Sequence, residues 1–202
     1  MKLYYSPGAC SLASHIALSE AGLAFTALKA PTKTHKLDDG TDYYAINPLG
    51  YVPFLALDDG NTLAEGPAIM QYIADQAPAK NLAPPNGTFA RYKLQSLLNY
   101  IGTEVHKSFS PLFNPATPAE VKEATTQKLL SRLKWIDGEL AGKQYLMGDT
   151  FTVADGYLFT VTNWAKPLNI DISGFANLLA VRERVGARPA VLAAMKAEGL
   201  LG

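Results

Sequence analysis

The chain has 202 residues, 48% of them hydrophobic, and its 18 basic and 18 acidic side chains leave no formal net charge. This balance gives no field that would draw the chain to nucleic acid or to an anionic membrane, and no uncharged apolar run has the roughly 18 residues of a membrane span. A single cysteine excludes an internal disulfide framework, and no apolar secretory leader follows Met1. We therefore expect a cytoplasmic protein without a metal site that binds a small molecule.

The first elements form a β-α-β unit. Residues 2–5 favour a short strand, and the Ser-Pro-Gly that follows favours a turn. Apolar residues at helical spacing after Cys10 predict a helix that ends at Gly22, since glycine is common at helix ends. Residues 23–30 then predict a second strand, and a polar stretch to residue 42 predicts a loop.

A hairpin and a further helix complete the first half. Residues 51–66 predict two strands joined at Asp59-Gly60, a dipeptide that favours tight turns. Proline is common at the first helical position, so we expect the next helix to begin at Pro67. The proline-rich stretch that follows is typical of a linker. We therefore predict a first domain over residues 1–78, a linker over 79–87 and a helical domain over 88–202.

Three apolar stripes at helical spacing occupy the second half. They consist of Leu94, Leu97, Leu98, Ile101 and Val105, then Leu129, Leu133, Ile136 and Leu140, and then Tyr157, Leu158, Val161 and Ala165. Two shorter helices are expected around residues 175–186 and from Pro189 onward. Thr152 and Asp155 have the spacing of a capping box, which we assign to folding, while Gly156 offers no side chain for a hydrophobic staple.

Cys10 is the only cysteine, and it stands at a helix start. A helix start exposes unpaired N–H groups and about half a positive charge, which stabilise a thiolate. We therefore predict a reactive thiol with a pKa below the ~8.5 of free cysteine; the alternative is a buried cysteine that packs as a small hydrophobe. Tyr5 and Ser11 carry hydroxyls that could donate to a bound thiolate, or could be ordinary strand and cap residues.

Two further elements have the chemistry of a peptide site. Pro53 follows a tight turn and precedes a strand, which is the setting of a cis proline that leaves the N–H and C=O of Val52 free to pair with an extended peptide. A trans proline at the strand entry is the alternative. Glu65 and Gly66 precede a helix, where free N–H groups suit a carboxylate and Glu65 suits an ammonium group. Glu65 could also be a surface charge that compensates the helix dipole.

These features occur in one order, and five segments carry a resemblance: YYSPGACSLASHI, INPLGYVP, LAEGPAIMQYIAD, LLNYIGTEVHKSFSPLF and FTVADGYLFT. They resemble the cytosolic glutathione transferases, and more narrowly the bacterial beta class, from Met1 to the AEGL near the C-terminus. The resemblance implies an α/β thioredoxin-like N-terminal domain with a mixed four-stranded sheet and an all-α helical-bundle C-terminal domain. It also implies a homodimer with one glutathione site per subunit, in which glutathione is a co-substrate and no cofactor is needed.

The resemblance assigns binding roles by matching position. It places the backbones of Ala9 and Val52, with Pro53, around the tripeptide, and Glu65 and Gly66 at its γ-glutamyl end. A second set of residues surrounds the sulfur or comes from the helical half. In this second set, Cys10 contacts the glutathione sulfur and forms a mixed disulfide with it, His106 and Lys107 lie by the thiol, and Asn99, Thr103 and Glu104 reach a glutathione across the dimer interface.

Helix geometry independently supports part of this assignment for the residues of the helical half. At 100° per residue, positions 99, 103 and 106 fall on one stripe beside the apolar stripe, as the wall of a site requires. A solvated helix face is the alternative. Three departures from the beta-class pattern bear on glutathione: His35 stands where the class has a lysine that faces the glycyl carboxylate, and Leu49 and Tyr51 replace a lysine and a glutamine in the turn before Pro53.

Three functions are compatible with these residues. The first is a transferase that holds glutathione as thiolate and lets it attack a small hydrophobic electrophile. The second is glutathione-dependent thiol-disulfide exchange through Cys10, without a resolving cysteine because Ala13 occupies that position. The third is a non-catalytic ligand- or partner-binding protein on the same fold. The first two can coexist in one enzyme.

Overall fold

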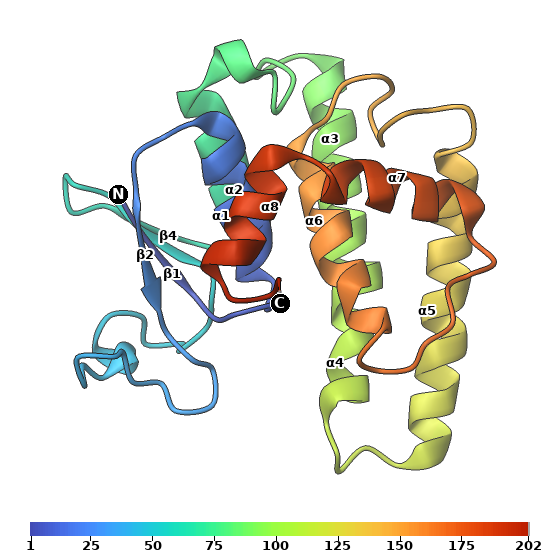
Figure 1. The fold of residues 1–202 in the computed structure, drawn as a ribbon, viewed down its shortest axis with the longest axis horizontal. Coiled ribbons are helices and arrows are strands. Elements are labelled where there is room, and N and C mark those ends of the chain that lie inside the picture. Colours follow the sequence, from blue (N-terminus) through green and yellow to red (C-terminus); the bar gives the residue numbers. More distant parts are fainter. Residues whose placement is uncertain (202) are drawn as a thin grey trace.

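The computed structural model describes residues 1–201, which begin with a four-stranded sheet covered by helices (Figure 1). In chain order this part contains β1 (Lys2–Tyr5), α1 (Ser11–Ala21), β2 (Thr26–Lys29), β3 (Phe54–Ala56), β4 (Thr62–Ala64) and α2 (Gly66–Gln76). The strand order is β2-β1-β3-β4, with β1 and β2 parallel and the other neighbours antiparallel. The prediction of a mixed four-stranded sheet is confirmed.

Local sequence signals place the turns of this unit. α1 begins directly after Cys10 and is capped by Gly22, whose φ of 68° is a left-handed conformation that glycine adopts without strain. β3 and β4 form the expected hairpin around Asp59-Gly60. α2 begins at Gly66, so Pro67 is its second residue and not its first. The order β-α-β-β-β-α is therefore as predicted, with a one-residue error at the last helix.

Helices and their connecting loops form the second half. They are α3 (Phe89–Tyr100), a π-helical segment (Ile101–His106), α4 (Lys107–Phe113), α5 (Ala119–Glu139), α6 (Val153–Thr162), α7 (Ala176–Gly186) and α8 (Pro189–Ala197), with 3₁₀ turns at Tyr43–Ala45, Pro78–Lys80 and Asn163–Ala165. α8 returns to the first part and packs against α1, beside which it lies in Figure 1. The all-helical second half is confirmed.

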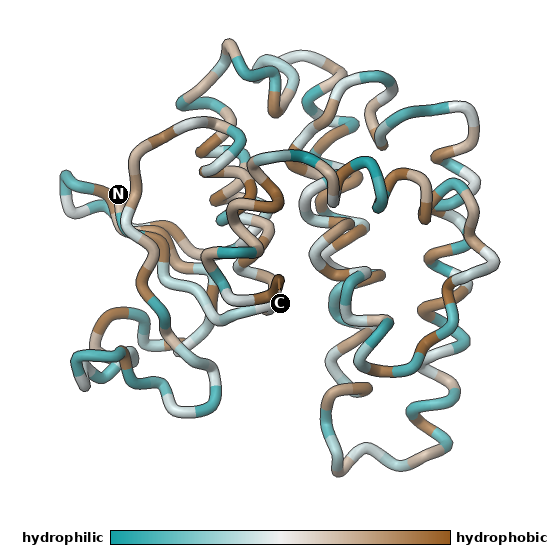
Figure 2. The backbone as a smooth tube through the Cα atoms, in the orientation of Figure 1, coloured by the Kyte–Doolittle hydropathy of each residue, from teal (hydrophilic) through white to brown (hydrophobic). Residues whose placement is uncertain are grey.

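The apolar stripes form the core between these helices. Every residue of the second and third stripes is buried, and in the first stripe Leu97 alone is only partly buried. The tip of the β3–β4 hairpin and the loop before Tyr43 are hydrophilic by comparison (Figure 2). None of the helices among residues 1–201 combines the length and apolarity needed to cross a bilayer.

The helix that follows the linker is not a regular α-helix throughout. Its apolar stripe predicts one continuous period of 3.6 residues, but Ile101–His106 form a π-helical segment between α3 and α4. Such segments are rare and occur frequently at functional sites. Ile101 and Val105 remain buried across it, so the apolar pattern carries no sign of the wider turn.

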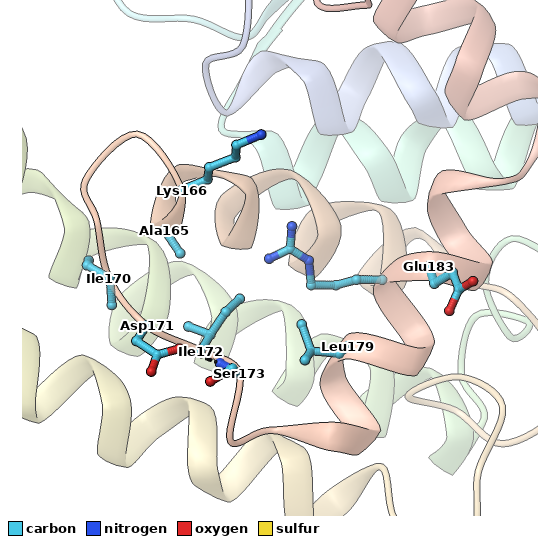
Figure 3. Close-up of a pocket in the computed structure, with 9 residues that line it drawn as sticks. Ala165, Lys166, Ile170, Asp171, Ile172, Ser173, Leu179 and Glu183 are labelled. Carbon is cyan, nitrogen blue, oxygen red and sulfur yellow. Dashed lines mark hydrogen bonds between the residues drawn. The ribbon is translucent and has the colours of Figure 1, made fainter.

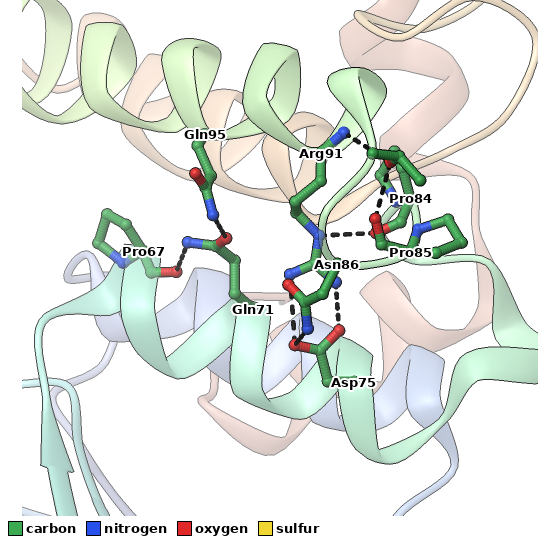
Figure 4. Close-up of polar contacts among 9 residues, drawn as sticks. Pro67, Gln71, Asp75, Pro84, Pro85, Asn86, Arg91 and Gln95 are labelled. Atoms are coloured by element: carbon green, nitrogen blue, oxygen red, sulfur yellow. Dashed lines mark hydrogen bonds and ion pairs between the residues drawn. The ribbon is translucent and has the colours of Figure 1, made fainter.

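A polar cluster holds the linker against α2 and α3 (Figure 4). The Arg91 side chain donates from Nε to the Pro84 carbonyl oxygen at 2.6 Å and from both Nη atoms to the Asp75 carboxylate. The same carboxylate accepts from Asn86 Nδ2 at 3.0 Å. Arg91 is only 2% exposed, so the cluster fixes where the two halves of the chain meet.

The start of α6 is fixed by a capping box and packs against α1 of the first half. The Asp155 carboxylate accepts from the Thr152 N–H at 2.8 Å and from the Leu146 N–H at 2.7 Å, and the predicted capping box is confirmed. Burial raises the pKa of Asp155 to about 6 although these donors lower it. A Cβ at Gly156 would lie 3.3 Å from Ile16 Cγ2, so this glycine lets α6 approach α1.

Candidate functional site

A cleft of about 420 Å³ lies between the sheet unit and the wall formed by α3, the π-helical segment and α6. Most of the residues predicted from the sequence line it, namely Ala9, Cys10, Val52, Pro53, Glu65, Gly66, Asn99, Thr103, His106 and Lys107. Its other lining residues are Thr32, Asn47, Leu49, Tyr51, Ala64, Pro67, Leu98, Gly102 and Tyr157. No three His, Cys, Asp or Glu side chains among residues 1–201 are arranged to hold a metal ion.

Cys10 lines this cleft at the start of α1. Its Sγ donates a hydrogen bond to the Val52 carbonyl oxygen at 3.2 Å. Burial raises the pKa of the Cys10 thiol to about 11, while backbone N–H groups at the helix start and the Lys107 ammonium lower it by less. The prediction of a lowered thiol pKa is therefore wrong for this arrangement, because desolvation of the sulfur outweighs the partial charge of the helix start.

The turn before β3 presents one backbone edge to the cleft. The Val52–Pro53 peptide bond is cis, as predicted. Tyr43 Oη and Asn47 Nδ2 both donate to the Tyr51 carbonyl oxygen, at 2.8 and 2.9 Å, and hold the turn. The Val52 N–H donates to no group within residues 1–201, whereas its carbonyl accepts from the Cys10 thiol. The N–H is thus available to an extended peptide, and the carbonyl is shared with Cys10.

Glu65 and Gly66 form the start of α2. Glu65 has a φ of 67°, an uncommon conformation for a non-glycine residue, and its carbonyl oxygen accepts from the first turn of the helix. The Gly66 N–H finds no partner in the described part of the chain, so it remains available at the positive end of the helix. Burial raises the pKa of Tyr157, and the nearby Cys10 and Glu65 raise it further, so the Glu65 carboxylate lies close to the same cleft.

The helical wall keeps the predicted stripe despite the π-helical segment. Asn99, Thr103 and His106 all line the cleft, with Thr103 Oγ1 donating to the Asn99 carbonyl oxygen at 3.0 Å. Glu104 does not line it, because its Oε2 accepts from Arg132 Nε on α5 at 2.8 Å. The structure therefore separates Glu104 from the other predicted residues of this wall.

His106 is bonded to a residue that the sequence analysis assigned only to the core. Its Nδ1 lies 2.7 Å from Tyr157 Oη, and its ring meets Trp164 at an inter-centroid distance of 5.0 Å. Burial lowers the pKa of His106 to about 4, and the neighbouring Lys107 ammonium adds to this effect. The imidazole is therefore neutral at pH 7.

Two family models match this chain: Glutathione S-transferase, N-terminal domain, over residues 8–76, and Glutathione S-transferase, C-terminal domain, over residues 100–189. Glutathione S-transferase GstA of Escherichia coli O157:H7 is 46% identical over 200 residues, which cover 99% of this chain and 100% of that protein. The chain belongs to the glutathione S-transferase family. The sequence-based resemblance is confirmed.

Solved structures agree with this assignment. BphK, a bacterial transferase solved as a ternary complex, is 56% identical with a TM-score of 0.97, covering 99% of this chain and 100% of that one. The beta-class transferase of Sphingomonas chungbukensis is 49% identical with a TM-score of 0.96, covering 100% of both chains. A sphingomonad transferase solved with glutathione is 48% identical with a TM-score of 0.95, covering 99% and 100%. The thioredoxin-like N-terminal domain and the helical C-terminal domain are thereby confirmed.

The two hydroxyls proposed as thiolate donors do not line the cleft of this transferase. Ser11 is fully buried, and its Oγ accepts from the Ser6 N–H at 3.1 Å and donates to the Ser6 carbonyl oxygen at 3.2 Å. Tyr5 is buried in β1 with its ring centroid 5.7 Å from that of His15. Ser11 therefore supports the loop that carries Cys10, Tyr5 packs against α1, and neither hydroxyl is shown bonded to the sulfur.

His35 also lies outside the cleft lining. Its ring packs on Tyr44 with centroids 4.5 Å apart, and a Cβ at Gly50 would lie 2.9 Å from its Nδ1. That buried nitrogen has no hydrogen-bond partner among the described residues. The ring thus supports the turn that carries Leu49 and Tyr51, and these two residues line the cleft.

Tyr157 is the main residue that sequence reasoning missed in this transferase. It belongs to an apolar stripe and is 3% exposed, yet its hydroxyl reaches the cleft beneath Gly102, where an added Cβ would lie 3.6 Å from Oη. A buried tyrosine needs a partner for its hydroxyl, and that requirement was the available signal. The spacing alone could not show that the partner is His106.

A second cleft, of about 570 Å³, lies between α7 and the segment that follows α6 (Figure 3). Its lining includes Ile170, Ile172, Leu179 and Arg182. The Arg182 guanidinium already donates to the Thr162 carbonyl oxygen at 2.8 Å, at the C-terminal end of α6. Its cation therefore serves the fold by compensating a helix end, and the cleft that contains Cys10 is the candidate active site.

Proposed function

We propose that this transferase conjugates glutathione to small hydrophobic electrophiles, with glutathione as co-substrate. The arrangement of the Cys10 cleft carries this proposal. A free helix N–H at Gly66 suits the α-carboxylate of a γ-glutamyl group, and the Glu65 carboxylate suits its ammonium. The free Val52 N–H then pairs with the cysteinyl peptide unit, which directs the thiol of the tripeptide toward Cys10.

Groups around the proposed position of the glutathione sulfur favour its thiolate form. A free thiol is only a few per cent ionised at neutral pH, so stabilising the thiolate is the main catalytic task. Lys107 supplies a positive charge, and the protonated Cys10 thiol supplies a hydrogen-bond donor. With an aryl halide, the glutathione thiolate forms the new C–S bond, the halide leaves with the bonding electrons, and the thiol proton passes to solvent. Glutathione sulfur is therefore the nucleophile.

An aromatic cluster that includes His106 adjoins the proposed position of the glutathione sulfur and suits an apolar electrophile. The Trp164 ring meets His106, Phe109 and Phe113 edge to face, with centroids 5.0, 5.5 and 5.6 Å apart. Phe113 is 50% exposed, so part of the cluster is accessible from outside. We place the electrophile against this exposed edge, where burial of its apolar surface would hold it near the sulfur.

Replacing Cys10 should separate conjugation from exchange chemistry. We expect Cys10→Ala to retain turnover of glutathione with a chromogenic aryl halide within about tenfold, the value of one lost hydrogen bond to a charged group. Oxidised glutathione at pH 9 should add one glutathionyl group to the native protein and none to the variant, as read by intact mass. A native protein with no turnover above the uncatalysed rate would favour a non-catalytic binding role, and a folded Cys10→Ala without turnover would make Cys10 the nucleophile.

We further propose a homodimer in which Asn99 and Thr103, which line the Cys10 cleft of their own subunit, also reach the glutathione bound to the partner. Two large apolar side chains on α3, Phe89 and Tyr92, are 75% and 59% exposed, as an uncovered subunit surface would be. Tyr51, at the rim of the cleft, is 67% exposed. The domain limits 1–78, 79–87 and 88–202 remain part of the same proposal.

The role of Asn99 can be tested by binding. Asn99→Ala should weaken binding of S-methylglutathione by about 1 to 2 kcal/mol, because one hydrogen bond to a charged group is lost. Calorimetric titration gives the affinity, and Gln127→Ala on α5 serves as a control with the same loss of an amide. A monomer in sedimentation at micromolar concentration, with the affinity of Asn99→Ala unchanged, would contradict the shared site.

A further inference from the structure

The bond between His106 and Tyr157 joins two elements that are distant in sequence. Nδ1 and Oη lie 2.7 Å apart, across 51 positions of the chain, and the rings meet at 89° with centroids 5.9 Å apart. Tyr157 reaches this position from α6 next to Gly102 in the π-helical segment, where an added Cβ would lie 3.6 Å from its Oη, an ordinary contact distance. Both rings line the cleft that contains Cys10.

The chemistry of the two partners sets the direction of this bond. Burial lowers the pKa of His106 to about 4 and raises that of Tyr157, so both are neutral at pH 7. A neutral imidazole has one protonated nitrogen and one bare nitrogen. A phenol is a stronger donor than an imidazole N–H, and a bare imidazole nitrogen is a stronger acceptor than a phenol oxygen. Tyr157 therefore donates to Nδ1, and the imidazole proton resides on Nε2.

The protonated nitrogen is the one available to a ligand. Nε2 has no hydrogen-bond partner within residues 1–201, and the ring borders the cleft. The other titratable groups that line this cleft come from four separate places in the chain: Cys10 at α1, Tyr51 in the turn before β3, Glu65 before α2 and Lys107 on α4. None of them is hydrogen-bonded to the imidazole, so Tyr157 alone among the described residues determines which nitrogen carries the proton.

We propose that Tyr157 is a positioning residue that fixes His106 as an Nε2–H donor to a negatively charged sulfur in the cleft. The proton stays on each group throughout, and no bond is broken in this role. If the hydroxyl were absent, the ring could carry its proton on Nδ1 and would then present a lone pair to the anionic sulfur. This inference rests on the proposed function for the identity of the sulfur, but its first step, the choice of tautomer, does not.

The tautomer can be read in the protein without any substrate. Long-range ¹H–¹⁵N spectra distinguish the two neutral forms of each of the three histidines, and His106→Gln assigns the signal. We expect native His106 to be protonated on Nε2 and Tyr157→Phe to show a mixture or the other form. Tyr100→Phe is the matched control, since its Oη donates to the Arg132 carbonyl oxygen outside the cleft. A native Nδ1–H form, or an unchanged form in Tyr157→Phe, would overturn the proposal.

Kinetic measurements then test whether the fixed imidazole stabilises the negatively charged sulfur. In Tyr157→Phe we expect kcat with an aryl halide at pH 6.5 to fall about tenfold while KM for glutathione changes less than about twofold. The thiolate absorbance of bound glutathione should appear at higher pH than in the native complex, and His106→Gln should add little to the loss. Unchanged kcat and absorbance profiles would refute the role. A native protein that does not conjugate would refute the proposed function, while the spectra would still decide what Tyr157 does to the imidazole.

Discussion

Iodoacetamide should alkylate Cys10 at pH 7 about 100-fold more slowly than it alkylates a free cysteine, because the reactive species is the thiolate. Burial raises the pKa of this thiol from the ordinary 9.0 to about 11, and each unit removes about nine-tenths of the thiolate present at neutral pH. The rate should keep rising with pH up to about 11. Intact mass measures it directly, since Cys10 is the only cysteine.

A neighbouring charge provides an internal check on this result. The Lys107 ammonium lowers the pKa of Cys10, so Lys107→Gln should slow alkylation further at every pH below the midpoint. Lys143→Gln is a suitable control, because its ammonium faces Glu139 at 3.8 Å, far from the cleft lining. A midpoint below the ordinary 9.0 in the native protein would mean that the helix start outweighs desolvation after all.

The same balance bears on the choice between conjugation and exchange. Thiol-disulfide exchange requires a thiolate at Cys10, so burial slows it by the same factor as alkylation. A protonated Cys10, in contrast, is a ready donor to an anionic sulfur beside it. The thiol now donates to the Val52 carbonyl oxygen, an acceptor that the cysteinyl N–H of a tripeptide would compete for. Conjugation by the thiolate of glutathione is therefore the reaction that this arrangement favours.

Features encoded by a few neighbouring residues were predictable from the sequence. The position of Cys10 at a helix start, the cis bond before Pro53 and the hairpin at Asp59-Gly60 all depend on local backbone preferences, and all three are confirmed. The family resemblance then ordered these features into one site. The pKa of Cys10 was mispredicted because desolvation depends on atoms from distant segments, which no local pattern contains.

The polar contacts of the helical wall likewise depend on distant segments. Glu104 was predicted to reach a glutathione across the dimer interface, and within one chain its carboxylate accepts from Arg132 on α5, 28 residues away. Tyr157 was assigned to the core by its spacing, and only the packing of α6 beneath Gly102 brings its hydroxyl to His106. Periodicity identifies the buried side of a helix, but it does not show what the polar end of a buried side chain touches.

A buried carboxylate near the C-terminus holds the loop that carries Cys10. The Glu198 side chain has 0% exposure. Its Oε1 lies 2.9 Å from His15 Nδ1, and its Oε2 accepts from the Gly8 N–H at 2.9 Å. The Gly8 carbonyl oxygen accepts from Trp164 Nε1 at 2.8 Å. Both polar groups of one loop residue are thus bound by side chains of the helical half, two positions before Cys10.

Glu198→Ala should therefore lower the free energy of unfolding by about 2 to 5 kcal/mol, since it leaves the partly buried Gly8 N–H and the buried His15 nitrogen without partners. Urea unfolding at one fixed protein concentration measures the change. Glu198→Gln, which keeps an acceptor for Gly8 and a donor for His15, should lose less. Glu183→Ala, an exposed change on α7, should stay within about 0.5 kcal/mol of the native protein.

The same variants also test whether the carboxylate controls the site as well as the fold. Once the Gly8 N–H is released, the loop is free to admit water to Cys10, which reduces the desolvation that raises the thiol pKa. Alkylation of Cys10 in folded Glu198→Ala should then be faster at pH 7 than in the native protein, with Glu198→Gln between them. If the free energy of unfolding falls as expected while the alkylation rate is unchanged, Glu198 stabilises the fold without setting the environment of the sulfur. If neither quantity changes, the contact contributes nothing measurable.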